Sequence, residues 1–137
     1  MKHTSIILLL GLALLLAGCD SFYKVLIINK TSTSLQVKIH YDKPDSYWFS
    51  GLDTTNAEVL NSYRADTIIM IVKPDGFILA GSNHGISKFY DAESMYCDYL
   101  EIQFDSTTYI ATSRKGVINI LHNLKKGDRV GEHEIVE

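Results

Sequence analysis

Hydrophobic and polar residues alternate with a period of two along most of the chain after residue 21. Successive side chains of a β-strand point to opposite faces, so the strict alternation over residues 35–42 predicts a strand with one face in the core. Residues 22–29 are apolar on both faces, as in a central strand, and the polar run 29–34 predicts a turn that joins the two strands as a β-hairpin. The predicted core face of the second strand consists of Leu35, Val37, Ile39 and Tyr41, and its water-facing side consists of Gln36, Lys38, His40 and Asp42.

The same pattern predicts further strands along the rest of the chain. They are short, rich in β-branched and aromatic residues, and separated by Gly, Pro, Asp and Ser. The predicted strands are residues 66–72 paired with 77–80 across Pro74-Asp75-Gly76, residues 99–105 paired with 107–112 across Asp105-Ser106, and a single strand at 117–121. Residues 134–137 are expected to form a short last strand or a frayed end.

One short helix is predicted after residue 54. The run Thr55-Asn56-Ala57-Glu58 has the spacing of a capping box, and Ala57, Leu60 and Arg64 would lie near one another on the following turns. Six to eight strands at intervals near ten residues, with at most one short helix, predict a single all-β domain. We expect a β-sandwich of immunoglobulin-like or transthyretin-like size, and a small barrel is the alternative.

The first eighteen residues have a different pattern. A basic start, Met1-Lys2-His3, precedes an uninterrupted apolar or small run from Ile6 to Gly18. This run is shorter than the roughly 20 residues that span a bilayer. The segment 1–18 is therefore predicted to be a cleaved secretory signal peptide.

The end of this segment resembles the lipobox of bacterial lipoproteins. An apolar residue and two small ones, Leu16-Ala17-Gly18, precede Cys19, and in that family the signal peptidase recognises such residues and the cysteine takes the lipid. The resemblance implies that Cys19 is the first mature residue and anchors the protein to the inner or outer membrane of a cell envelope without crossing it. Residues 19–21 then form a minimal tether, and residues 22–137 form the β-sandwich domain.

Composition narrows the range of partners and cofactors. The chain carries a net charge of −3, and removing residues 1–18, which hold one lysine and no acidic residue, moves this to −4. Without a basic excess, nucleic acid is not expected as a partner. With Cys19 consumed by lipid, Cys97 is the remaining cysteine and is predicted to be a buried, inert thiol. No cofactor is predicted.

The sequence contains no Gly-rich phosphate loop, Gly-x-Ser-x-Gly, His-Glu-x-x-His or Cys-x-x-Cys motif, which disfavours the common hydrolase classes. The densest group of titratable residues extends from His84 to Asp98. This region also holds Asp91, Glu93 and Cys97, from which a Cys/His nucleophile pair could be drawn. The alternative interpretation of the protein is therefore a small periplasmic or surface hydrolase that uses this region. We favour a structural cysteine and a polar loop over residues 81–85, with no catalytic residue assigned.

Three further groups of residues are candidates for binding or modification. The consecutive aromatics Tyr47, Trp48 and Phe49 could stack on a ligand or glycan, because neighbours on a strand alternate faces. A metal site from His122, Glu132, His133 and Glu134 is weighed and set aside in favour of a solvated charged tail. Three tripeptides, Asp53-Thr54-Thr55, Asp66-Thr67-Ile68 and Asp105-Ser106-Thr107, resemble the O-glycosylation acceptor of exported Bacteroidota proteins, which implies modification at Thr54, Thr67 and Ser106.

Taken together, the lipobox, the immediate strand 22–29 and the late segment 98–105 resemble small uncharacterised lipoproteins of the Bacteroidota. This resemblance implies export, lipidation and a β-sandwich, and it assigns no catalytic residue. We expect a non-enzymatic, lipid-anchored module that binds a protein or glycan partner near a membrane.

Overall fold

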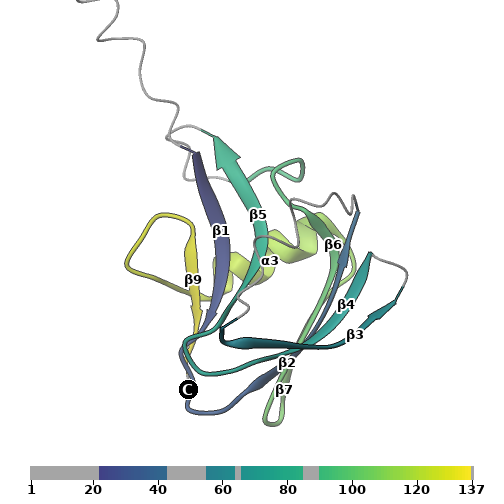
Figure 1. Cartoon of the computed structure of the whole chain (residues 1–137). Coiled ribbons are helices and arrows are strands. Elements are labelled where there is room, and N and C mark those ends of the chain that lie inside the picture. Colours follow the sequence, from purple (N-terminus) through teal and green to yellow (C-terminus); the bar gives the residue numbers. More distant parts are fainter. Residues whose placement is uncertain (1–21, 43–54, 64–65, 85–89, 137) are drawn as a thin grey trace, which may run out of the picture.

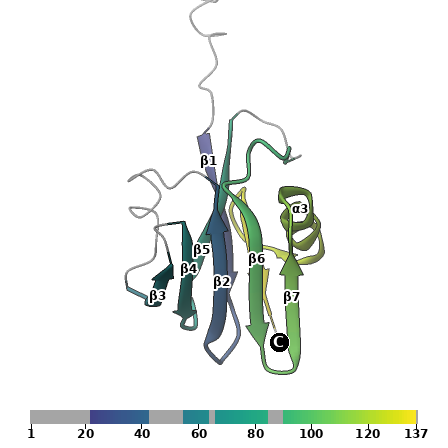
Figure 2. The same cartoon turned by 90° about the vertical axis from the view of Figure 1, so that its right-hand side faces the viewer.

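Two β-sheets pack face to face and enclose one core (Figure 1). The computed structural model describes residues 22–42, 55–63, 66–84 and 90–136. The first sheet contains, in spatial order, β5 (Phe77–His84), β1 (Phe22–Asn29), β9 (Glu132–Ile135) and β8 (Lys125–Lys126). The second contains β3 (Ala57–Tyr63), β4 (Thr67–Val72), β2 (Leu35–Tyr41), β6 (Cys97–Phe104) and β7 (Thr107–Ala111), as Figure 2 shows from its outer side. The predicted all-β sandwich is confirmed.

The pairing of the early strands differs from the prediction. β1 pairs with β5 and, in parallel, with β9, whereas β2 pairs with β4 and β6 in the other sheet. The predicted hairpin of residues 22–29 with 35–42 is therefore wrong, although the predicted core face of β2 is buried. The partnership of residues 66–72 with 77–80 is wrong in the same way, because β4 and β5 lie in opposite sheets. Both polar connections are corners between sheets.

Two other segments have a different secondary structure from the one predicted. Residues 57–63, predicted as a helix, form the edge strand β3 and complete the second sheet beside β4. Residues 117–121, predicted as a strand, lie within helix α3 (Arg114–Asn123). The side chain of Ser113 caps this helix by accepting from the Gly116 N–H at 3.2 Å. Val117, Ile120 and Leu121 are buried with i, i+3, i+4 spacing, which marks one face of a helix.

The late strands agree more closely with the sequence pattern. The hairpin of β6 and β7 is confirmed, with the turn at Asp105, whose φ of 46° is left-handed. The last strand, β9, begins at Glu132, two residues before its predicted start. β5 continues to His84, so residues 81–84 belong to a strand and the predicted polar loop there is wrong. No helix among the described residues is long and apolar enough to span a bilayer.

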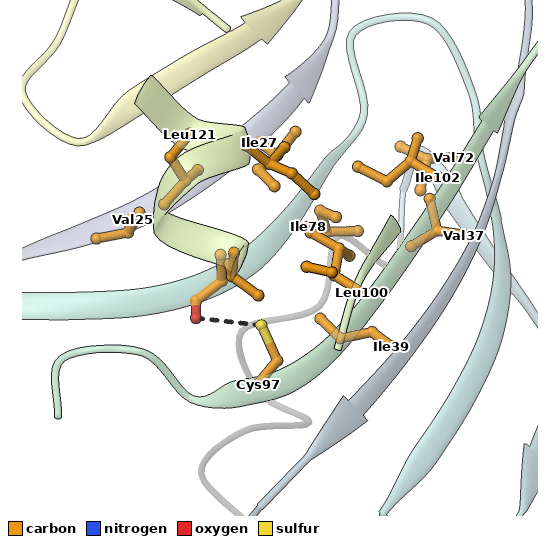
Figure 3. Packing of buried hydrophobic residues seen from close by; sticks show 14 of the residues in the cluster. Val25, Ile27, Val37, Ile39, Val72, Ile78, Cys97, Leu100, Ile102 and Leu121 are labelled. Carbon is orange, nitrogen blue, oxygen red and sulfur yellow. Dashed lines mark hydrogen bonds between the residues drawn. The ribbon is translucent and has the colours of Figure 1, made fainter. Parts of the chain in front are cut away.

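The core lies between the two sheets and is closed on one side by α3, which packs against β6 and β7. Figure 3 shows Val25, Ile27 and Ile78 of the first sheet facing Val37, Ile39 and Leu100 of the second, with Leu121 of the helix beside them. Cys97 belongs to this core: its thiol donates to the Ala80 carbonyl at 3.7 Å, and burial raises its pKa to about 12. The prediction that this cysteine is buried is confirmed.

A buried asparagine holds the two corners together. The side-chain amide of Asn29 donates to the carbonyls of Thr33 and Val72 at 2.8 and 3.0 Å, and its oxygen accepts from the Thr31 N–H and hydroxyl at 3.0 and 2.7 Å. The Asn29 backbone N–H donates to Gly76, and its carbonyl accepts from Asp75. Asn29 is completely buried, so every polar atom of its amide has a partner inside the protein.

Replacing this residue tests how strongly the corners depend on it. Asn29→Ala removes the four hydrogen bonds of the side-chain amide, to the Thr33 and Val72 carbonyls and from the Thr31 N–H and hydroxyl. Each such bond contributes about 1 kcal/mol to stability. We expect the free energy of unfolding to fall by about 4 kcal/mol, measured by urea denaturation. Thr33→Ala is the matched control, because Thr33 is exposed and contributes backbone atoms to the network. Equal effects of the two substitutions would contradict this role of Asn29.

Candidate functional site

A pocket of about 490 Å³ opens where the β8–β9 hairpin meets the first half of β1. We call it the β9 pocket. Four aromatic rings line it: Tyr23 from β1, Tyr90 from the segment before β6, His122 from the end of α3 and His133 from β9. The hairpin supplies the remaining lining residues, Lys126, Arg129, Val130, Gly131 and Glu132. Four separate parts of the sequence therefore converge on one concave surface.

Gly131 positions the hairpin against β1. Its φ of +88° lies in the left-handed region, and a Cβ there would approach the Lys24 carbonyl to 2.2 Å. The Gly131 carbonyl accepts from the Leu26 N–H at 2.8 Å, which starts the parallel pairing of β9 with β1. β9 covers β1 only from Leu26 onward, so the wall of the pocket at Tyr23 lies beyond the end of the paired segment.

A tyrosine and a histidine form the inner wall. The Tyr90 hydroxyl lies 2.6 Å from Nε2 of His133, and the two rings meet edge to face with centroids 5.4 Å apart. The ring of His122 stacks against that of Tyr90 with centroids 6.4 Å apart. These two contacts and the hydrogen bond to His133 hold the Tyr90 ring in place, so this wall is preorganised.

Burial sets the protonation of this pair. His133 is 4% exposed, and burial lowers its pKa, helped by the nearby His122 and Lys126 and opposed by the backbone carbonyl of Leu121. Burial also raises the pKa of Tyr90 to about 12, with a smaller contribution from Tyr23. At neutral pH both groups are therefore uncharged.

The hydrogen-bond partners decide the direction of the Tyr90–His133 bond. Nδ1 of His133 is buried and has no hydrogen-bond partner among the described residues, and the nearby Leu121 backbone presents a carbonyl, which only accepts. We assign the proton of the neutral imidazole to Nδ1, which leaves Nε2 to accept from the Tyr90 hydroxyl. The lone pairs of the Tyr90 oxygen then remain as acceptors.

The rim of the pocket carries charged groups. Lys126 and Arg129 are exposed, and neither forms an ion pair with a described carboxylate. The side chain of Glu132 is restrained by the preceding loop, because one of its carboxylate oxygens accepts from the backbone N–H of Arg129 at 3.1 Å. Val130, at the tip of the loop, is 69% exposed. The rim thus presents two cationic side chains, one restrained carboxylate and one exposed apolar side chain.

The predicted charged tail is wrong at two positions. His133 and Glu134 are buried, because β9 inserts between β1 and β8 in place of ending in solvent. Glu134 accepts from the Lys125 ammonium at 2.8 Å. Within the described ranges, no cluster of three His, Cys, Asp or Glu side chains could hold a metal ion.

The residues between His84 and Asp98 do not form one site in the part of the chain that the structure describes. Cys97 is buried in the core, Asp91 accepts from the Ser94 N–H and hydroxyl, and Asp98 pairs with His40 at 2.5 Å. The side chain of His84 lies outside the described residues. The strand register places neighbouring side chains on opposite faces, which separates the members of this group.

His40 joins three strands on the outer face of the second sheet. Its Nδ1 bonds Asp98 at the start of β6, and its Nε2 lies 3.6 Å from the Asp66 carboxylate before β4. The bond to Asp98 is the main reason that the pKa of His40 is raised. This half-exposed network joins neighbouring strands and does not line the β9 pocket, so we regard it as a cross-strand contact.

The other predicted site residues fall in two classes. Thr67 is half-buried at the start of β4, where its hydroxyl donates to Asp66 at 3.3 Å, and Ser106 is exposed in the turn between β6 and β7. The remaining ones lie outside the described residues: Leu16, Ala17, Gly18, Cys19, Tyr47, Trp48, Phe49 and Thr54.

No family model, curated protein or solved structure matches this chain. The geometry of the β9 pocket is therefore the basis on which a site is assigned. Of its residues, sequence reasoning singled out His122, Glu132 and His133, but for a metal site that was set aside. It missed Tyr23, Tyr90, Lys126 and Arg129, because they come from distant segments and match no motif.

The lowered pKa of His133 predicts a pH-dependent stability. Because the unfolded chain binds this proton more readily than the folded protein, the contribution of neutral His133 is present above about pH 6.5 and is lost as the pH falls below it. We expect the free energy of unfolding of the wild type to fall relative to that of His133→Gln between about pH 7.5 and about pH 5.5. Parallel pH profiles from urea denaturation would contradict a buried, neutral histidine.

Proposed function

We propose that this protein is a lipid-anchored module of a bacterial cell envelope that binds a protein or glycan partner near the membrane, through the β9 pocket. The observation that carries the proposal is the pocket itself: a preformed concave surface with fixed aromatic rings and two cations that have no described counter-ion. Pockets of about 300 to 1,000 Å³ with these features are typical binding sites for small ligands or for single groups of a larger partner.

The sequence at the start of the chain supports the anchor. Leu16-Ala17-Gly18 precedes Cys19, and the first strand begins at Phe22. Residues 19–21 would reach about 10 Å from the lipid to the start of the strand. Tyr23, the second residue of β1, lines the β9 pocket, so the pocket would open close to the headgroups of the membrane that holds the anchor.

The chemistry of the described pocket favours binding over catalysis. A pKa near 12 keeps Tyr90 protonated and therefore a poor nucleophile, and its hydroxyl is already engaged by His133. The Cys97 thiol lies in the core, away from the pocket lining. We propose accordingly that the protein is not an enzyme and that the pocket recognises a partner without changing it.

Cysteine substitution tests the anchor in the native host. Cys19→Ala removes the thiol that would take the lipid, so we expect the protein to accumulate as unprocessed precursor or to leave the membrane fraction. The measurement is membrane fractionation with intact-mass analysis. Cys97→Ala is the matched control and should keep both membrane location and lipid mass. An unchanged location and mass of Cys19→Ala would contradict the anchor.

Site-specific photocrosslinking tests the pocket as the binding surface. A photo-activatable residue at Val130, on the pocket rim, should form a defined adduct in intact cells, whereas the same residue at Ile110 on the edge strand β7 should not. The two positions are matched, since their side chains are 69% and 58% exposed. Arg129→Glu should abolish the adduct at 130. No adduct at 130, or an equal adduct at 110, would contradict the proposal.

A further inference from the structure

We infer that the partner of the β9 pocket is a sugar that carries a carboxylate, such as a hexuronate residue of a glycan. This inference depends on the proposed function, because it names the chemistry of the ligand that the pocket holds. It is drawn from three features that lie together on the pocket wall: unpaired cations, a fixed aromatic ring and free hydrogen-bond acceptors.

The cations point to an anionic group on the ligand. Lys126 and Arg129 are exposed and form no described ion pair. Among the lining residues, the charge of Glu132 offsets one of these two cations and leaves one net positive charge. One carboxylate oxygen of Glu132 is turned toward the Arg129 N–H. A guanidinium can bind both oxygens of a carboxylate at once, which gives this side of the pocket a preference for a planar, two-oxygen anion.

The aromatic wall points to a ring with an apolar face. Tyr90 is held edge to face by His133 and stacked by His122, so little conformational entropy is lost when a ligand packs on the pocket wall. Tyr23 adds a second tyrosine to the lining. The C–H face of a pyranose is apolar and flat, and it suits the negative face of an aromatic ring.

The acceptors point to hydroxyl groups on that ring. With the imidazole proton of His133 assigned to Nδ1, the Tyr90 hydroxyl donates to Nε2 and its oxygen can accept. Glu132 has a second carboxylate oxygen that no described group binds. Both acceptors need donors from the ligand, and sugar hydroxyls are donors. A simple anion would use only the cations, and a neutral sugar would use only the ring and the acceptors. A sugar acid uses all three features.

The size of the pocket agrees with this class of ligand. A volume of about 490 Å³ is in the lower half of the range for small-molecule sites and is sufficient for one or two sugar rings. The exposed loop from Lys126 to Val130 leaves the pocket open on one side, so the ring can belong to a longer chain.

Titration of the full-length protein in detergent tests the inference. The probes are D-glucuronate and D-galacturonate, each compared with D-glucose or D-galactose, which have a neutral CH₂OH group in place of the carboxylate. We expect saturable binding of at least one uronate, at least about tenfold tighter than its neutral counterpart, as one charge-assisted hydrogen bond requires. In NMR spectra, the uronate should shift resonances of Tyr90 and residues 122–133 and leave those of β3 and β4 unchanged.

Two substitutions identify the residues involved. Arg129→Gln keeps a polar side chain with N–H donors and removes the positive charge, and it should weaken uronate binding about tenfold or more. Lys115→Gln, at an exposed position of α3 outside the pocket, is the matched control and should bind as the wild type does. The NMR map on the wild type keeps the test valid if a variant fails to fold.

Each other outcome overturns a defined part of the inference. Acetate that binds as tightly as a uronate would replace the sugar with a simple anion, and a neutral sugar that binds equally well would remove the role of the cations. If neither uronate binds while the crosslink from position 130 persists, the ligand class is wrong and the binding module stands. If the crosslink is also absent, the proposed function fails as well.

Discussion

The side-chain amide of Asn29 is the contact on which the arrangement of the two sheets depends. It lies where the chain leaves β1 in the first sheet and turns toward β2 in the second, and it also bonds the last residue of β4. Its backbone bonds Asp75 and Gly76, at the other corner between the sheets. One buried residue thereby fixes two crossings of the chain, and it fixes them only because all four hydrogen-bonding positions of the amide are used.

The position of the β9 pocket follows from these corners. Because β2 lies in the second sheet, it does not pair with β1. The side of β1 that faces away from β5 is therefore open, and β9 pairs with it in parallel. The pairing of β9 with β1 begins only at Leu26, because Gly131 brings the hairpin in against Lys24 just before that point. The uncovered first residues of β1 then meet α3 and Tyr90, and the hollow between them becomes the pocket. The pocket thus forms because β9, the last strand of the chain, pairs with only the second half of β1, the first strand.

Local patterns in the sequence predicted where strands lie better than they predicted which strands pair with one another. The alternation in residues 35–41 identified β2 and its buried face, and the turn at Asp105 identified the hairpin of β6 and β7. Residues 30–34 and 73–76 look like hairpin turns, but long-range contacts of Asn29 make them corners, which no local pattern reveals. The i, i+3, i+4 spacing of Val117, Ile120 and Leu121 was a signal for α3 that the β-rich context outweighed. The pocket was beyond prediction, because its rings come from positions 23, 90, 122 and 133.

The most direct measurement of the central contact is NMR of the Asn29 side-chain amide in the intact protein. A carboxamide that donates to Thr33 and Val72 inside the protein should give two well-separated proton resonances that exchange slowly with solvent and show NOEs to both of these residues. This result would confirm that Asn29 holds the corner between the sheets. Rapidly exchanging resonances at the positions of a solvated amide, with no NOE to Val72, would contradict it.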